Sequence, residues 1–193
     1  MDRNRYAPPG TEDAEPVVIQ RDVSADLYFA LSPSAQPQHL IDGLLYICPL
    51  QTREHHELVE LVYAALREFA ATEGGFAIAQ GFECRLSDDT VVQPDAGYVT
   101  PARRDIVGRW LRGAPDLAVE VLSAGTAQFD NEAKFAAYGR SGVREAWFID
   151  PTRGTTTVVF GDGDGWVREE FVPFGADLPS ELVSVGPANL PRR

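Results

Sequence analysis

The sequence predicts an α/β (α+β) domain in which helices flank a mixed β-sheet. Two observations carry this prediction: short β-type apolar runs alternate with two amphipathic helical segments, and turn-forming residues separate the runs. The chain has 193 residues, of which 44% are hydrophobic and 24% charged, as in a globular protein. This length fits a single domain with a sizeable core.

The ends of the chain differ in composition from its middle. Residues 1–16 are polar and rich in Pro and acid, which predicts a flexible tail and argues against a secretory signal. We expect one domain over residues 17–185 and a short C-terminal tail over residues 186–193. No apolar run is long enough to predict a membrane span. Cys48 and Cys84 form no CxxC pattern and favour a reducing cytoplasm.

The first half of the domain is expected to hold a short helix, a hairpin and a long helix. Ser24 is placed to cap a helix over residues 25–31. Asp42-Gly43, a favoured hairpin dipeptide, predicts strand–turn–strand over residues 39–47. Apolar residues at helical spacing predict a helix over residues 52–73.

The second half is expected to alternate strands with one helix. Residues 76–86 and 91–100 are expected to pair as strands around a polar turn. The elements that follow are a strand over 117–122, a helix over 126–140, a strand over 145–150 and a hairpin of 155–160 with 166–171. The rest of the chain, from residue 172 onward, is rich in Pro and is expected to be irregular.

The charge of the chain is strongly acidic and unevenly distributed. A net charge of −12 argues against a nucleic-acid partner, because phosphate binding usually leaves a basic footprint. The connection over residues 101–112 is locally basic, which makes its arginines either candidate phosphate contacts or ordinary groups of a solvated loop. These arginines are Arg103, Arg104, Arg109 and Arg112.

Two carboxylates stand in β-type runs. Glu120 lies in an apolar strand that is expected to be covered on both faces, where a carboxylate must pair with a cation or bind a metal. Asp95 follows Pro94, which kinks a strand or marks its edge. The alternatives are a Glu120 that is merely bound to an arginine and an Asp95 that closes a turn.

Lys134 is the only lysine among 17 cationic residues. It shares a helix face with Thr126, Asp130 and Tyr138, which are spaced four residues apart. One interpretation is a surface Asp–Lys pair; the other is a face directed at the end of the sheet, from which Lys134 reaches Glu120. A lysine supplies a compact charge whose pKa can shift, unlike an arginine.

Two carboxylates and a lysine are the parts that phosphodiester hydrolysis needs. Carboxylates hold Mg²⁺ with several waters retained, and the metal acidifies one water. The lysine orients that water and adds positive charge at the transition state. His55, on the inward face of its helix, and Glu83, on the strand expected beside Asp95, are accessory candidates. Their simpler interpretations are a buried structural histidine and a solvated acid.

Four segments, taken in order, resemble the Uma-type restriction-endonuclease-like family, a bacterial branch of the PD-(D/E)XK nuclease superfamily. They are Gln93-Pro-Asp95, Pro115-Asp-Leu-Ala-Val-Glu-Val-Leu-Ser123, Asp130-x-x-x-Lys134-x-x-x-Tyr138 and Gly142-Val-Arg-Glu-Ala-Trp-Phe-Ile-Asp-Pro151. The resemblance spans about residues 24–172. His39 is a departure, because the family more often has Glu before the Leu-Ile-Asp-Gly turn.

The resemblance implies a restriction-endonuclease-like fold that often assembles as a homodimer. Asp95 and Glu120 would bind Mg²⁺ (or Mn²⁺), with the Val121 carbonyl as a third ligand. In the superfamily, the catalytic lysine usually follows the acid by two residues. In this branch it would lie on the following helix instead, and Lys134 is the residue that matches it. We therefore expect a metal-dependent endonuclease that hydrolyses DNA phosphodiester bonds. The alternatives are a catalytically idle binding module with a protein partner and a hydrolase of small phosphate esters.

Overall fold

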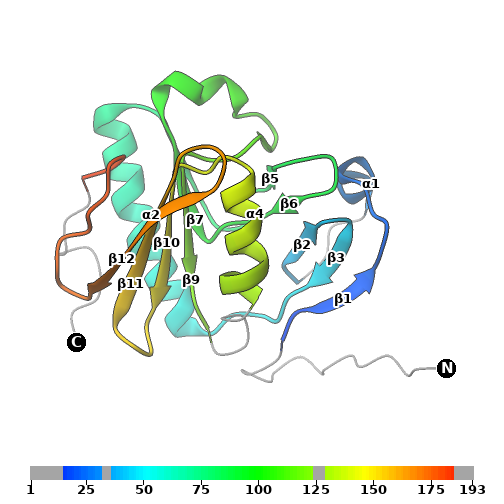
Figure 1. Cartoon of the computed structure of the whole chain (residues 1–193), viewed down its shortest axis with the longest axis horizontal. Helices are drawn as coiled ribbons and strands as arrows, with labels where there is room; N and C mark the ends of the chain where they lie inside the picture. The colour runs from blue at the N-terminus through cyan, green and yellow to red at the C-terminus, as the bar shows by residue number, and fades with distance from the viewer. Residues whose placement is uncertain (1–14, 32–35, 124–128, 185–193) are drawn as a thin grey trace.

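The computed structural model describes residues 15–31, 36–123 and 129–184. Its strands form two six-stranded mixed sheets, and the expected α+β class is confirmed (Figure 1). The elements are β1 (Val17–Gln20), α1 (Ala25–Ala30), β2 (Gln38–Ile41), β3 (Leu44–Ile47), α2 (Arg53–Glu73), β4 (Phe76–Ile78), β5 (Cys84–Arg85), β6 (Val91–Val92), β7 (Ala96–Val99), a 3-10 helix (Pro101–Ile106), β8 (Leu111–Arg112), β9 (Leu117–Val121), a π-helical turn (Asp130–Lys134), α4 (Phe135–Arg140), β10 (Glu145–Asp150), β11 (Thr155–Gly161) and β12 (Trp166–Pro173).

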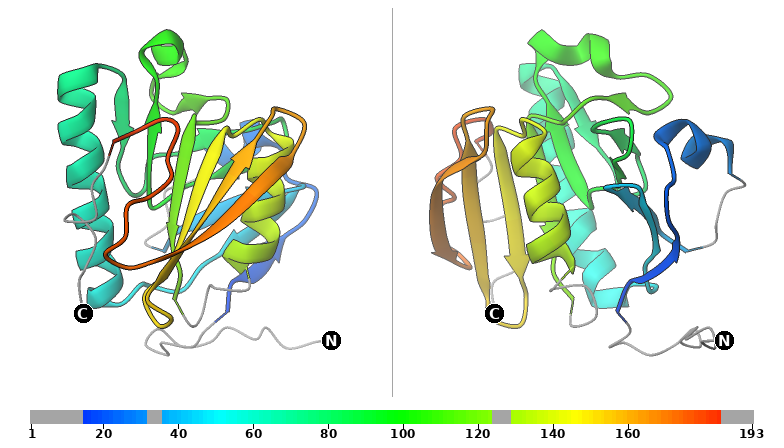
Figure 2. Two further views of the ribbon diagram at one scale, coloured as in Figure 1. Left: turned by 60° about the vertical axis from the view of Figure 1, so that its left-hand side comes forward. Right: turned by 45° about the vertical axis from the view of Figure 1, so that its right-hand side comes forward.

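The first sheet, which contains the longer strands, has the order β12-β11-β10-β9-β7-β4 and carries a helix on each face. Only the β9–β10 pair is parallel in it. α2 covers one face and α4 the other, as the two views in Figure 2 make clear. On the α2 side the core holds Leu58, Val62, Leu66, Tyr98, Leu117, Val119, Trp147 and Ile149. On the α4 side it holds Ala118, Leu122, Ala137, Tyr138, Ala146 and Phe148.

The second sheet has the order β1-β3-β2-β6-β5-β8 and includes the expected hairpin. Asp42 and Gly43, with φ of 52° and 74°, form its two-residue turn, because both positions need a left-handed backbone. The small core of this sheet includes Tyr28 of α1 together with Leu40, Leu45 and Val91.

The first two predicted helix starts are confirmed. Ser24 Oγ accepts a hydrogen bond from the Leu27 N–H at 3.2 Å, and Thr52 Oγ1 accepts one from the His55 N–H at 3.2 Å. Each hydroxyl satisfies a donor that has no partner inside the helix. No helix in the described ranges combines the length and apolar character needed to cross a bilayer.

The expected strands 76–86 and 91–100 are each broken in two. Their first and last parts, β4 and β7, pair in one sheet, whereas β5 and β6 pair in the other. Pro94 lacks the N–H that a continuous ladder needs, and Gly81 turns the other strand with a φ of 83°. The single sheet that we expected is therefore two sheets, which diverge at this break.

Three smaller differences concern element boundaries. β1 was not expected, because its four residues show no clear alternation. β12 extends to Pro173, two residues beyond the predicted hairpin. The predicted helix start at Thr126 and the C-terminal tail lie outside the described residues, and the helix is π-helical over Asp130–Lys134.

Candidate active site

Asp95 and Glu120 meet at one end of the sheet that α2 and α4 cover. β7 pairs with β9 so that Ala96 faces Val119, and Asp95 lies one residue before the start of β7. The Asp95 N–H donates to the Val119 carbonyl at 3.0 Å, and Asp95 Oδ2 accepts from the Val121 N–H at 2.9 Å. Asp95 is thus hydrogen-bonded to the residues on either side of Glu120 in β9.

The Asp95 carboxylate accepts hydrogen bonds from three groups. Oδ2 accepts from the Val121 N–H at 2.9 Å and lies 3.2 Å from His55 Nε2, while Oδ1 accepts from Gln80 Nε2 at 3.0 Å. Burial opposes ionisation most strongly, but His55, the charge of Lys134 and the Val121 N–H together lower the pKa of Asp95 below its ordinary value. Asp95 is therefore held as a carboxylate.

His55 supports Asp95 from the first turn of α2. Its side chain is buried, and its Nδ1 has no hydrogen-bond partner among the described residues. Because an ionised carboxylate only accepts hydrogen bonds, Nε2 carries the proton that faces Asp95. The predicted accessory histidine thus touches a predicted metal ligand, and it is positioned by the Thr52 cap that starts the helix.

Glu120 is held by two side chains of the following helical segment. Lys134 Nζ donates to Glu120 Oε2 at 2.8 Å, and the Tyr138 hydroxyl donates to Oε1. Lys134 is 5% exposed and Glu120 1% exposed, so the interpretation of Lys134 as a surface lysine is wrong. The shared helix face does meet the sheet, as the spacing of Lys134 and Tyr138 predicted. Thr126 lies outside the described residues.

The main chain of Val121 also faces this site. In a β-strand the N–H and C=O of one residue point to the same side. Since the Val121 N–H donates to Asp95, its carbonyl oxygen is directed to the Asp95 side of β9 as well. Two carboxylates and one carbonyl oxygen therefore border the same strand end.

This oxygen set suits a hard cation. Mg²⁺ is commonly bound through one or two carboxylates and retains several waters. An ionised carboxylate has about four lone-pair sites, so the three donors on Asp95 leave Oδ1 able to accept a further ligand. Within the described ranges, no group of three or more His, Cys, Asp or Glu side chains could hold a metal. Asp95, Glu120 and Val121 thus fit Mg²⁺ or Mn²⁺ better than a cation that needs four protein ligands.

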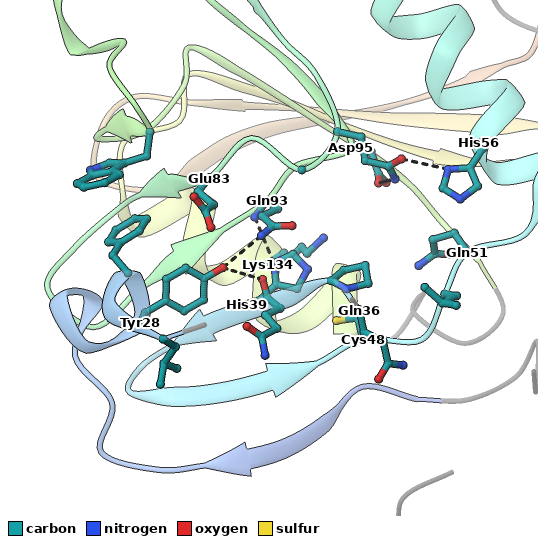
Figure 3. Close-up of a pocket in the computed structure, with 18 of the residues that line it drawn as sticks. Tyr28, Gln36, His39, Cys48, Gln51, His56, Glu83, Gln93, Asp95 and Lys134 are labelled. Atoms are coloured by element: carbon teal, nitrogen blue, oxygen red, sulfur yellow. Dashed lines mark hydrogen bonds between the residues drawn. The ribbon is translucent and has the colours of Figure 1, made fainter. Parts of the chain in front are cut away.

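Asp95 and Lys134 open on a cavity of about 520 Å³ at the break between the two sheets. In Figure 3, Asp95 and His56 lie at one side of it, Tyr28 and Glu83 lie at the other, and Gln93, His39 and Lys134 lie between them. His39 Nδ1 accepts from the Gln93 N–H at 3.2 Å. Burial, followed by the charge of Lys134, lowers the pKa of His39 well below its ordinary value, so His39 is neutral.

Glu83 lines the side of this cavity that is opposite Asp95. Burial raises the pKa of Glu83, and the charge of Arg109 and the nearby Tyr28 hydroxyl partly oppose this effect. The strand break between β4 and β5 separates Glu83 from Asp95, which the expectation of a continuous strand could not foresee.

The four predicted arginines have different surroundings. Arg103 donates to Asp116 Oδ1 at 3.0 Å and to the Ala114 carbonyl at 2.9 Å. Arg104 donates to the Gly75 carbonyl, and Arg112 donates to the Asp105 carbonyl. Of the four, only Arg109 lines the cavity, with its guanidinium 5.9 Å from the centre of the Trp110 ring.

Sequence reasoning missed several cavity residues, among them Gln80, Gln93, Phe29 and Trp110. The signal that could have found Gln80 and Gln93 is the proline that breaks the second strand, since residues beside such a break leave the ladder. Phe29 and Trp110 come from distant parts of the chain, and no local pattern links them.

The fold is that of a restriction-endonuclease-like protein. A solved structure described as a putative nuclease belonging to DUF820, from Anabaena variabilis ATCC 29413, superposes on this chain with a TM-score of 0.73. The match covers 86% of this chain and 96% of that chain at 18% sequence identity. Residues 25–188 match the Uma2 family, described as "Putative restriction endonuclease", and the chain belongs to this family. No curated protein matches the chain in sequence.

Proposed function

We propose that this protein is a metal-dependent nuclease that hydrolyses phosphodiester bonds of DNA. The observation that carries the proposal is that Asp95 is hydrogen-bonded to Val119 and Val121, the two neighbours of Glu120 in β9, while Lys134 is bound to Glu120 and lines the cavity. Membership of the Uma2 family supports the same class of chemistry.

Asp95, Glu120 and the Val121 carbonyl are the groups that would hold the metal. When bound, Mg²⁺ or Mn²⁺ supplies a water of lowered pKa and positive charge against the attacked phosphate. His55 and the Val121 N–H keep Asp95 ionised and oriented. These contacts preserve the negative charge that attracts a cation.

Lys134 has two tasks in this proposal. Its ammonium neutralises the buried Glu120 carboxylate, and it also lines the cavity. An ammonium has three donors, so it can orient a water in the cavity and stabilise negative charge that develops on a phosphate oxygen. Tyr138 fixes the other oxygen of Glu120 and so limits the rotation of that carboxylate.

The test compares cleavage and metal binding in one set of variants. Wild type, Asp95→Asn, Glu120→Gln and the exposed control Glu169→Gln are incubated with single-stranded and duplex DNA and Mg²⁺ or Mn²⁺. Circular dichroism checks the fold of each. We expect cleavage by wild type and Glu169→Gln, and its loss in the two site variants. Calorimetry should find Mn²⁺ binding that Asp95→Asn lacks.

Equal behaviour of wild type and both site variants would overturn the proposal. No metal binding by wild type up to millimolar concentration would favour an idle binding module on the same fold. Cleavage of a chromogenic phosphodiester without cleavage of DNA would indicate a small-ester hydrolase, which the net charge of −12 makes a reasonable rival.

A further inference from the structure

The end of the cavity opposite Asp95 is aromatic. The rings of Phe29 and Trp110 stack with centroids 4.1 Å apart and planes 17° apart. Tyr28 meets Phe29 edge-on, with centroids 5.3 Å apart. All three line the cavity that Asp95 and Lys134 also line. The hydrolytic chemistry proposed above uses none of these rings.

Phe29 and Trp110 are only partly buried, and both line the cavity. They come from α1 and from the residue before β8, so the fold brings together two distant segments to build this wall. The Arg109 guanidinium lies 5.9 Å from the centre of the Trp110 ring. A flat aromatic surface beside a cation suits a ligand that has both a planar ring and a negative charge.

Polar groups complete this end of the cavity. Gln93 Nε2 donates to the Tyr28 hydroxyl at 3.2 Å, and that hydroxyl donates to the Gln38 carbonyl at 3.2 Å. The Gln93 amide oxygen is therefore left to accept hydrogen bonds, and the Glu83 carboxyl lies nearby on the same wall. The edges of nucleobases carry the N–H donors that such acceptors bind.

We infer that this aromatic end binds an unpaired nucleobase, so that the substrate is single-stranded rather than duplex nucleic acid. The inference rests on the proposed nuclease function, because that function makes a nucleotide the ligand. In a duplex, both faces of a base are covered by its neighbours, and only an unpaired base can stack on a protein ring.

The charge of the protein agrees with a single strand. A single strand has a lower density of phosphates than a duplex, as its weaker dependence on salt reflects. A chain of net charge −12 therefore repels a single strand less than a duplex. Base stacking, which is sequence-tolerant, supplies attraction that does not depend on a basic surface.

In the proposed complex, the nucleic-acid strand crosses the cavity from one side of Figure 3 to the other. The base lies at the side of Tyr28 and Glu83, and the scissile phosphate lies at the side of Asp95, with Lys134 between them. Arg109 is placed to contact a phosphate at the aromatic end. A nucleotide near the cleaved bond is thus held by its base while the bond itself faces the carboxylates.

Binding is tested on the full chain with EDTA present, so that no metal contributes. Anisotropy of labelled oligonucleotides compares a single DNA strand, its duplex, the RNA of the same sequence and a nucleoside monophosphate. We expect the single strand to bind more tightly than the duplex and the monophosphate. Trp110→Ala and Phe29→Ala should each weaken single-strand binding by roughly 5- to 100-fold.

Two further variants keep the test decisive if an alanine variant folds poorly. Trp110→Phe retains an aromatic ring, so it should bind the strand but lose the quenching of Trp110 fluorescence that base stacking causes. Phe171→Ala removes an aromatic ring that is 71% exposed on β12, outside the cavity, and should bind as wild type does.

The outcomes separate this inference from the proposed hydrolysis. Equal binding of duplex and single strand, or unchanged binding by a folded Trp110→Ala, overturns the base site even if DNA is cut. Tight binding of the nucleoside monophosphate would contradict the inference that the ligand is a strand of several nucleotides. Trp110-dependent binding without any cleavage in Mg²⁺ supports the base site and contradicts the hydrolysis. RNA binding equal to DNA binding supports recognition through the base.

Discussion

Lys134 Nζ lies 2.8 Å from Glu120 Oε2, in an ion pair that solvent hardly reaches. Removing two charges from water is costly, and well-packed apolar residues in their place often stabilise a protein equally or better. A pair of this kind is therefore weak evidence for a role in stability. Its position beside Asp95, on the wall of the cavity, favours a role in function.

Replacing Lys134 by Met should lower the free energy of unfolding by about 3–5 kcal/mol, because the variant leaves a buried Glu120 without its cation. Urea unfolding measures the change. The double variant Lys134→Met/Glu120→Gln should regain most of the loss, because it removes both charges. Arg53→Ala, which breaks an exposed i,i+4 pair with Glu57, is the control and should change stability by less than about 1 kcal/mol. A free energy of unfolding of Lys134→Met equal to that of wild type would show that Glu120 does not depend on Lys134 as its buried ion-pair partner.

Arg109 and Arg103 should behave differently when each is replaced by Ala. Arg109→Ala should weaken binding of single-stranded DNA and reduce the slope of log K against log salt by about 0.7, the share of one phosphate contact. Arg103→Ala should leave that slope unchanged and lower stability, since it deprives the buried Asp116 of a partner. Anisotropy over a salt series and urea unfolding measure the two effects. The reverse pattern would show that Arg103 is the phosphate contact.

Asp116 should make the protein sensitive to acid. It is fully buried, and although burial opposes ionisation, the Thr100 N–H and hydroxyl and Arg103 lower the pKa of Asp116 below 3.8. A depressed folded-state pKa means that its stabilisation is present above the unfolded-state pKa and is lost as pH falls through the folded value. Asp116→Asn should thus be less stable than wild type at pH 7, by about 1–3 kcal/mol.

The stability difference between wild type and Asp116→Asn should close as the pH falls below 3.8. Urea unfolding at a series of pH values measures it. Asp162→Asn, at an exposed position of the β11–β12 turn, should follow wild type throughout. A difference that is constant with pH would indicate that Asp116 acts through packing rather than through its charge.

His55 should tune metal binding without being a ligand. His55→Ala removes the group that lies 3.2 Å from Asp95 Oδ2, and loss of such a supporting contact commonly weakens metal affinity by about 10- to 100-fold. Calorimetry with Mn²⁺ measures the change. Glu60→Gln, on the exposed face of the same helix, is the control. Affinity equal to that of wild type would limit His55 to a packing role.

The parts of the fold that the sequence predicted are those whose signals are local. The Asp42-Gly43 turn and the Ser24 cap each depend on a few adjacent residues, and both were predicted correctly. The meeting of Lys134 with Glu120 could also be expected, because a short connection returns the helix beside the strand that it follows.

Other features depend on contacts between distant segments and could not be predicted. The contact between His55 and Asp95 joins α2 to the start of β7, and the stack of Phe29 on Trp110 joins α1 to the segment before β8. The division into two sheets was missed because a broken strand and a continuous one have the same apolar pattern. Pro94 marked the break but not the direction in which the chain leaves it.

The break between the sheets also determines where the sequence can change without disturbing the strands. Residues 79–83 and 93–95 join strands of different sheets, so most of them are outside both hydrogen-bonded ladders. Asp95 is nevertheless anchored through the Val119 carbonyl and the Val121 N–H. Changes at other residues of these connections that line the cavity, such as Gly81, Glu83 and Gln93, can therefore alter which ligand enters it while the Asp95 and Glu120 carboxylates keep their places.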